Sequence, residues 1–393
     1  MRCLLVTLPT FGYYNDLARA CADNAIEVVS VPCQSREDGL RVLEAVHSFR
    51  PHFILNHPVF SLLVSRIGAH KGIPVLHWLA DKIINQEHLR KELYSESDIV
   101  LATYRGDADK LVAADVKAYY LPNACNIKPM DYHVSEKKYG VSFVGTIELG
   151  INNYYRRFME ETRARFCQES PLHASVFQTM QEAFEEVLQQ QQVVAEQFRY
   201  VLPELVADIY RRIGPLLLQS NLHPDDLSSL LAKETASRQR RQIFQALPQL
   251  DAFGPEDWTQ AGLPNVRYRG VAEQYRESGQ VFAASCINLA ITRIYALDGL
   301  SDRIFNVMRA QGFLLANRQE TLAELFREGV DLEAYASLDE LLDKVRFYTE
   351  HADAAERIAR QGCDTVLRGH TFTHRIGTMR SMLARWSNPC AAC

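Results

Sequence analysis

The apolar run Cys3-Leu-Leu-Val-Thr-Leu8 lies close to the N-terminus and has the composition of a buried β-strand. Five similar runs follow, and segments with helical spacing of apolar residues, such as Arg36–Phe49, separate them. A repeated strand, helix, strand order with short turns predicts a parallel sheet that helices cover on both faces. The later strands are expected at Ile26–Val31, Phe53–Leu55, Ile73–Leu79, Ile99–Ala102 and Val116–Leu121.

The same alternation begins again at Val141-Ser-Phe-Val-Gly145, stops, and resumes at Leu250-Asp-Ala-Phe-Gly254. The chain is therefore expected to be an α/β protein with two doubly wound halves. A cleft between the carboxyl ends of their strands is the default place for a ligand. The further strands expected in the second half are Val266–Gly270, Cys286–Ile291 and Phe313–Ala316.

The segment that interrupts the second half, about residues 152–247, differs in composition. It contains one glycine, Gly214, and is rich in Glu, Gln, Arg, Leu and Ala, which favour long helices. We expect a helical insertion that acts as a lid, an acceptor platform or an oligomer contact, or that only elaborates the fold. The expected domains are residues 1–138 and 139–372, followed by residues 373–393, a helix that returns to the first domain and a tail.

The charge and cysteine content exclude several classes of protein. The 393 residues carry 43 Lys and Arg against 48 Asp and Glu, a formal net charge of -5, whereas a dedicated nucleic-acid-binding protein has a strongly basic face. No apolar run reaches the roughly 20 residues of a membrane-spanning helix. Nine scattered cysteines indicate reduced thiols in a cytoplasmic protein, with Cys390 and Cys393 in a disordered tail.

An ordered set of segments in the second half resembles the C-terminal half of the CgeB-like, group 1 family of glycosyltransferases. The set comprises Val141–Thr146, Leu250–Gly254 with Trp258, Val266–Gly270, Ile287–Ile291, Arg303–Met308, Gln311–Leu315 and Arg368–Phe372. Weaker similarity lies in Pro74–Trp78 with Asp81, and in Tyr120–Ala124. The resemblance implies a GT-B fold of two Rossmann-like domains. It also implies transfer of a sugar from a nucleotide-diphosphate sugar to a hydroxyl of a glycan, a protein or a small molecule, without a cofactor.

Glycines at strand ends are expected to bring the donor close to the backbone of the second half. Without a Cβ atom, such a residue lets a phosphate approach the main chain. Gly145 with Thr146, Gly254, and Val271 after Gly270 occupy positions of this kind. Each of these glycines is also compatible with an ordinary turn.

The polar loop Ala296–Arg303 leads into an apolar helix that either Ser301 or Asp302 can cap. The amino end of this helix would face the cleft, where its N–H groups suit an anion. Arg303 adds a fork of N–H donors that fits diphosphate oxygens, and the resemblance also places the donor nucleotide at this helix. Many relatives have a glutamate that holds the donor ribose where this chain has Asn306, so we expect a weaker ribose contact or a different donor.

The first half is expected to bind the acceptor. A carboxylate or an imidazole at the carboxyl end of a strand is well placed to take the proton of an acceptor hydroxyl. Asp81 is the first candidate for this base, followed by His57 and His77, although each is also compatible with a structural role. The loop Pro9–Asp16 contains glycine and aromatic residues and suits stacking on a sugar, or is an ordinary turn.

Two pairs of residues with metal-ligand spacing are interpreted as structural. Asp107 and Asp109 begin a helix, where acidic residues are favoured as caps. His370 and His374 lie one helical turn apart but have no third ligand nearby in the sequence. We therefore expect catalysis without a metal. A non-catalytic GT-B-fold binding or scaffold protein, which Asn306 would mark, and a sugar-nucleotide epimerase are the alternatives.

Overall fold

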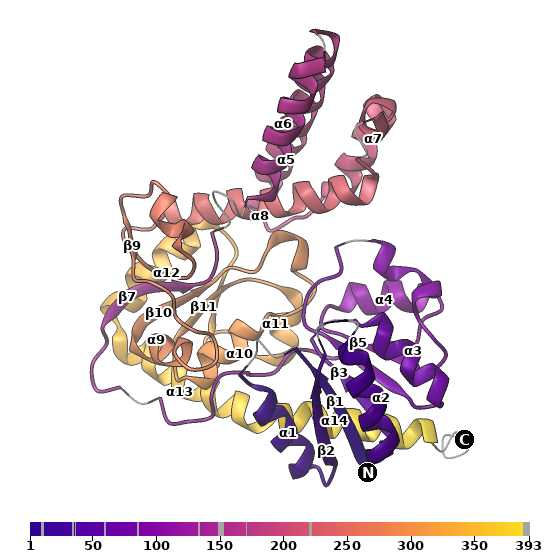
Figure 1. Cartoon of the computed structure of the whole chain (residues 1–393). Coiled ribbons are helices and arrows are strands. Elements are labelled where there is room, and N and C mark those ends of the chain that lie inside the picture. Colours follow the sequence, from indigo (N-terminus) through magenta and orange to yellow (C-terminus); the bar gives the residue numbers. More distant parts are fainter. Residues whose placement is uncertain are drawn as a thin grey trace.

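The computed structural model describes residues 1–387 except 9–11, 34, 36, 59, 85, 133, 148–152, 170 and 220–221. Two six-stranded parallel sheets lie side by side with helices on their faces, and four helices of the insertion stand above them (Figure 1). The expected α/β architecture with two Rossmann-like halves is confirmed. None of the helices in these ranges combines the length and apolar character needed to cross a membrane.

The first sheet has the strand order β2-β1-β3-β4-β5-β6. Its six strands correspond to the six expected runs: β1 (Arg2–Thr7), β2 (Glu27–Pro32), β3 (Phe53–Asn56), β4 (Val75–Leu79), β5 (Asp98–Ala102) and β6 (Ala118–Tyr120). Apolar side chains of the central strands fill both faces, which explains their continuous apolar sequence. The helices of this half are α1 (Tyr14–Asp23), α2 (Asp38–Phe49), α3 (Leu62–Lys71) and α4 (Arg105–Ala113), with short 3₁₀ segments at η1 (Gln86–Leu89) and η2 (Lys91–Leu93).

The second sheet has the order β12-β11-β10-β7-β8-β9. Its strands are β7 (Tyr139–Val144), β8 (Leu250–Phe253), β9 (Val266–Tyr268), β10 (Ser285–Ala290), β11 (Leu314–Asn317) and β12 (Glu333–Tyr335). The sequence analysis does not predict β12, which is three residues long and lies at the sheet edge. Its helices are α9 (Ser278–Ala284), α10 (Asp302–Arg309), α11 (Glu320–Leu325), α12 (Leu338–Glu350) and α13 (Ala352–Gly369), with 3₁₀ segments at η4 (Glu256–Gln260) and η5 (Ile294–Ala296).

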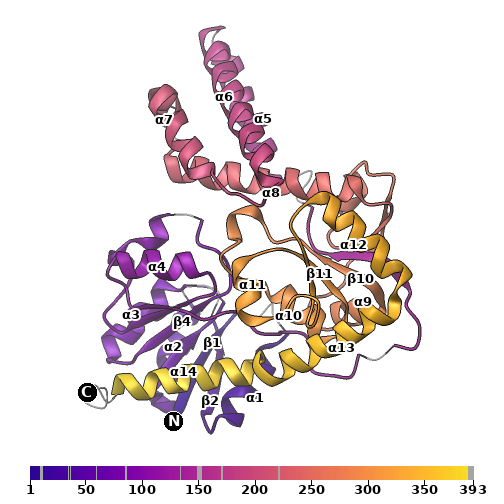
Figure 2. The ribbon, with the colours of Figure 1, turned by 180° about the vertical axis from the view of Figure 1, so that it is seen from behind.

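The insertion between β7 and β8 is helical, as its composition predicts. It consists of α5 (Tyr154–Glu169), α6 (Pro171–Ala195), α7 (Leu202–Gln219) and α8 (Pro224–Ala246). Helices α5, α6 and α7 project away from the sheets, whereas α8 lies along the body of the protein (Figure 1). The final helix, α14 (Phe372–Ser387), runs back to the first half, where Ile376, Met379 and Leu383 join its core (Figure 2).

A carboxylate of the second half caps a helix of the first half. Asp298 Oδ2 accepts hydrogen bonds from Gly106 N at 2.8 Å and from Lys82 Nζ at 2.6 Å. Asp107, which the sequence analysis interprets as a cap, instead accepts from Ile83 N at 2.8 Å and pairs with Lys82 at 2.9 Å. Asp107 lies in the first turn of α4 as expected, but its carboxylate does not cap the helix, because the amino end of α4 meets the other half of the molecule, where Asp298 supplies the acceptor.

A buried polar cluster lies within the first half around Asp98, which is 2% exposed. Its carboxylate accepts from Ser65 Oγ at 2.5 Å and Ser95 N at 2.8 Å, and lies 3.2 Å from His77 Nε2. Burial acts to raise the pKa of Asp98, but His77 and the hydrogen bonds of Ser65 and Ser95 outweigh it and lower the pKa. The ionised form is therefore the one that the fold stabilises.

Replacing Asp98 with alanine is expected to lower the free energy of unfolding by about 2–4 kcal/mol at pH 7, because buried donors lose their acceptor. A depressed folded-state pKa gives stability that is present above the ordinary carboxyl pKa and is lost as the pH falls through the folded value. The difference in the free energy of unfolding between wild type and Asp98→Ala should therefore become smaller as the pH is lowered. Urea unfolding across pH measures it, with exposed Glu96→Ala as a control that changes stability by less than about 0.5 kcal/mol. Equal stability of Asp98→Ala and wild type at pH 7 would contradict this account.

Candidate functional site

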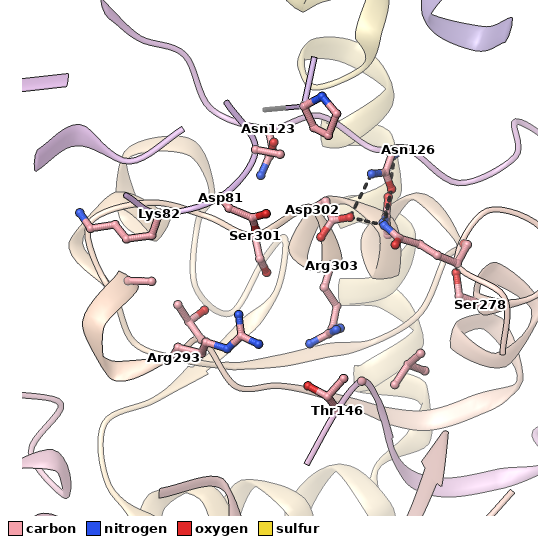
Figure 3. A pocket seen from close by; sticks show the side chains of 18 of the residues that line it. Asp81, Lys82, Asn123, Asn126, Thr146, Ser278, Arg293, Ser301, Asp302 and Arg303 are labelled. Carbon is pink, nitrogen blue, oxygen red and sulfur yellow. Dashed lines mark hydrogen bonds between the residues drawn. The ribbon is translucent and has the colours of Figure 1, made fainter. Parts of the chain in front are cut away.

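A cavity of about 980 Å³ lies between the carboxyl ends of the two sheets (Figure 3). Both halves contribute to its lining, as the sequence analysis expects for a cleft ligand site. Every predicted site residue except His77 lines it: His57 and Asp81 from the first half, and Gly145, Thr146, Gly254, Val271, Asp302, Arg303 and Asn306 from the second.

His77 lies away from the cavity, and its choice as a catalytic base is wrong for this structure. The side chain is 0% exposed, with Nδ1 3.1 Å from Asn56 Nδ2 and Nε2 3.2 Å from Asp98 Oδ1. Successive residues of a strand point to opposite faces of the sheet, so His77 turns away while the next residue, Trp78, lines the cavity. Both ring nitrogens of His77 therefore serve the core of the first half.

His57 is nearly buried at the wall of the cavity. Its Nδ1 lies 2.8 Å from the carbonyl oxygen of Trp78, and its Nε2 lies 3.4 Å from the hydroxyl of Tyr13. Burial lowers the pKa of His57 to about 4, although the hydrogen bond to Trp78 acts in the opposite direction. The ring is thus neutral at pH 7, and because a carbonyl only accepts, Nδ1 carries the proton. Nε2 keeps the lone pair beside Tyr13.

Asp81 is accessible to solvent within the cavity, just after β4. Loss of hydration raises its pKa, and the negative charge of Asp302 adds to this effect, while Arg293 acts to lower the pKa. A carboxylate with a raised pKa accepts a proton more readily than one on an open surface. Of the three predicted bases, Asp81 combines access to the cavity with this increased basicity.

The start of α10 faces the cavity without a side-chain cap. Ser301 occupies the N-cap position, but its side chain makes no capping hydrogen bond. The carboxylate of Asp302 instead accepts from Asn126 Nδ2 at 2.9 Å and from the side-chain amide of Gln274. The expectation that Ser301 or Asp302 caps the helix by its side chain is therefore wrong, because the side chains of Asn126 in the linker and Gln274 in the second half engage Asp302. The first-turn N–H groups remain suited to an anion.

Two guanidinium groups, those of Arg293 and Arg303, point into the same part of the cavity beside Thr146 (Figure 3). Arg303 lies over the ring of Phe143, 5.2 Å from its centroid, and within the described ranges its side chain forms no ion pair or hydrogen bond. Burial lowers the pKa of Arg303 and the charge of Arg293 lowers it further, although Asp302 acts to raise it. Two guanidinium groups in this part of the cavity suit a doubly charged ligand such as a diphosphate.

Sequence reasoning missed Arg293. It follows β10 at the carboxyl edge of the sheet, in the segment Thr292-Arg-Ile294, which carries no recognisable local motif. Its place after a central strand was the available signal, because ligand-binding side chains of α/β sheets gather at that edge.

The backbone around Gly145 and Gly254 is closely packed, which explains both glycines. A Cβ atom at Gly254 would lie 2.2 Å from the carbonyl oxygen of Gly145, and one at Gly145 would lie 3.0 Å from a guanidinium nitrogen of Arg303. Trp258 Nε1 donates to the same Gly145 oxygen at 2.8 Å. The two glycines therefore allow the ends of β7 and β8 to meet beside Arg303.

Asn306 is engaged by the linker between the two halves. Its Oδ1 accepts from Asn126 N at 2.8 Å and its Nδ2 donates to Asn126 Oδ1 at 2.7 Å, and the side chain is 2% exposed. This reciprocal pair needs a donor and an acceptor on one side chain, which an ionised glutamate does not offer. The structure thus gives Asn306 a structural role, which differs from the predicted weak ribose contact.

Comparisons with known proteins bear on the second half of the chain and on the fold. Residues 237–381 match the family model described as "Glycosyl transferase-like". One curated protein, the Lys-63-specific deubiquitinase BRCC36 of Rattus norvegicus, is 34% identical over 92 residues, 23% of this chain, and the match spans only 31% of that protein's length. It covers too little of either chain to carry a function.

Two solved structures are similar over almost the whole chain. Anabaena HepE in complex with UDP and glucose gives a TM-score of 0.55 at 11% identity, covering 98% of this chain and 99% of HepE. Sucrose-phosphate synthase from Thermosynechococcus elongatus gives 0.54 at 12% identity, covering 99% and 100%. At such identities these likenesses establish the fold. This chain therefore has the two-domain fold of these glycosyltransferases, and part of its second half matches the glycosyl transferase-like family model.

Proposed function

We propose that the protein transfers a hexosyl group from a uridine diphosphate sugar to an acceptor hydroxyl in the cleft. The pair of guanidinium groups at the carboxyl edge of the second sheet carries this proposal (Figure 3). The solved relative HepE contains UDP, which supports uridine as the nucleoside. The ordered segments of the second half support a place in the CgeB-like branch.

The geometry divides the work between the two halves. Arg293, Arg303 and the amino end of α10 would hold the diphosphate and stabilise the negative charge that it gains as the sugar leaves. Asp81, which the first half contributes to the cavity, would take the proton of the acceptor hydroxyl. Two fixed guanidinium groups supply the positive charge that a metal ion supplies to diphosphates in other enzymes, so we expect no metal requirement. A cytoplasmic location stays a prediction from the cysteine content.

Arg303→Ala should weaken UDP binding by about tenfold or more, because a charge-assisted hydrogen bond contributes roughly 1.5–3 kcal/mol. Isothermal titration with UDP measures the dissociation constant. Arg303→Lys keeps the charge without the fork and should recover part of the loss. Arg276→Ala removes an exposed arginine outside the cavity and should bind like wild type.

Failure of the wild type to bind any of UDP, GDP, ADP or dTDP would refute the transferase proposal. Binding of UDP that Arg303→Ala leaves unchanged would refute the donor site alone. Conversion of the sugar nucleotide without release of UDP would identify an epimerase instead.

Asp81→Asn should slow the release of UDP from UDP-glucose, with water as the acceptor, by about 100-fold or more, because a positioned general base contributes roughly 10²–10⁴-fold. UDP affinity should not fall, since the substitution removes a negative charge and leaves Arg293 and Arg303 in place. The raised pKa of Asp81 predicts that the wild-type rate falls in acid, starting at a higher pH than an ordinary aspartate would give. Asp109→Asn, on the exposed side of α4, is the control. A normal rate in Asp81→Asn would assign the base to another group.

A further inference from the structure

Helix α8 of the insertion runs over both halves, from the first half to the second (Figures 1 and 2). Near the start of α8, burial raises the pKa of Asp225. The negative charges of Asp226 and Glu87 raise it further, and Arg90 acts to lower it. Because Glu87 belongs to η1, these interactions place this end of α8 beside η1 of the first half. At its end, Ile243, Phe244 and Leu247 belong to the core of the second half. The insertion is thus part of the wall of the interdomain cavity.

Two cationic side chains of α8 line that cavity, Lys233 and Arg240. They are seven residues apart, so they lie on one face of the helix, about 10 Å from each other along its axis. Arg240 stands at the diphosphate end, because its guanidinium donates to the carbonyl oxygens of Thr146 at 3.2 Å and Ile291 at 3.3 Å. Since α8 begins at the first half, Lys233 lies on the acceptor side of Arg240.

Lys233 is a half-buried cation that no described carboxylate neutralises. The next residue in the chain, Glu234, is acidic, but it forms a salt bridge with Arg238 at 2.8 Å and accepts a hydrogen bond from Asn153 at 3.0 Å. The ammonium of Lys233 lies 4.4 Å from the ring centroid of Tyr154, which holds it by a cation–π contact. Within the described ranges it forms no ion pair or hydrogen bond, so its donors are available to a ligand.

We propose that Lys233 binds a carboxylate or phosphate group of the substrate beyond the diphosphate, on the transferred sugar or on the acceptor. The inference rests on the proposed glycosyl transfer and names an acidic substrate class for the same cavity. The positive charges of Arg293 and Arg303 balance the two negative charges of a diphosphate. Lys233 lies closer to the first half, so we expect it to bind a different anionic group. A lysine ammonium is a compact charge that pairs with either kind of anionic group.

Binding of matched neutral and acidic probes tests the inference. UDP-glucose is compared with UDP-glucuronate for the donor arm, and glucose with glucose 6-phosphate, each in the presence of UDP, for the acceptor arm. In one arm the full-length wild type should bind the acidic probe about tenfold or more tightly than the neutral one. Lys233→Ala should remove that preference without changing UDP or UDP-glucose binding, and Lys233→Arg should retain most of it.

Arg241→Ala is the matched control, because it removes one positive charge from α8 at a residue outside the cavity lining. It should keep the preference for the acidic probe. If UDP binds but neither acidic probe is preferred, or if Lys233→Ala keeps the preference, the inference is wrong and the proposed transfer stands. If the wild type binds no nucleotide, the proposed function fails first and this inference fails with it.

Discussion

Arg303 holds a positive charge in the interdomain cavity without a carboxylate partner in the described part of the chain, and the site is arranged around this constraint. Removing an unpaired charge from water costs stability, and the neighbouring charge of Arg293 increases that cost. The fold can hold Arg303 there because the rest of α10 is well packed, with Ile304, Phe305, Val307 and Met308 fully buried. An anionic ligand would remove the penalty. The unfavourable electrostatics of these two neighbouring cations are therefore a source of affinity for an anionic ligand.

Polar contacts join the two halves of the protein. On one side Asp298 joins Lys82 to the amino end of α4. On another, the hydroxyl of Tyr275 donates to Asp16, and its ring packs so closely on Gly12 that a Cβ there would lie 2.7 Å from Cδ1. Substrate exchange by domain opening would break these polar contacts, and closure would restore them and exclude water from the reaction.

Strands and helices with a periodic or compositional signal were predictable from the sequence. The roles of single residues that depend on where a side chain points were not. Runs of strand-forming residues predict eleven of the twelve strands in the described part of the chain, and the central strands are the most clearly marked because burial on both faces needs continuous apolar residues. Strand β12 is too short to give that signal. His77 was misjudged because the sequence does not reveal which face of β4 it joins. The pairing of Asn306 was not predictable for a different reason: its partner, Asn126, is 180 residues away in the chain. Arg293 was not predicted because it comes to lie beside Arg303 only in the folded protein, where the end of β10 is next to the start of α10.

The position of the insertion follows from strand direction rather than from its own sequence. In a parallel sheet each strand ends at the edge that faces the cleft, so the chain leaving β7 emerges beside the ligand site. The insertion starts at that edge, and its last helix must return along the body before β8 begins, next to β7. A long insertion at this point therefore borders the cavity, whatever the role of its projecting helices. The helical composition of residues 152–247 did not show this, yet the strand order makes α8 a wall of the site and brings Lys233 to the acceptor side.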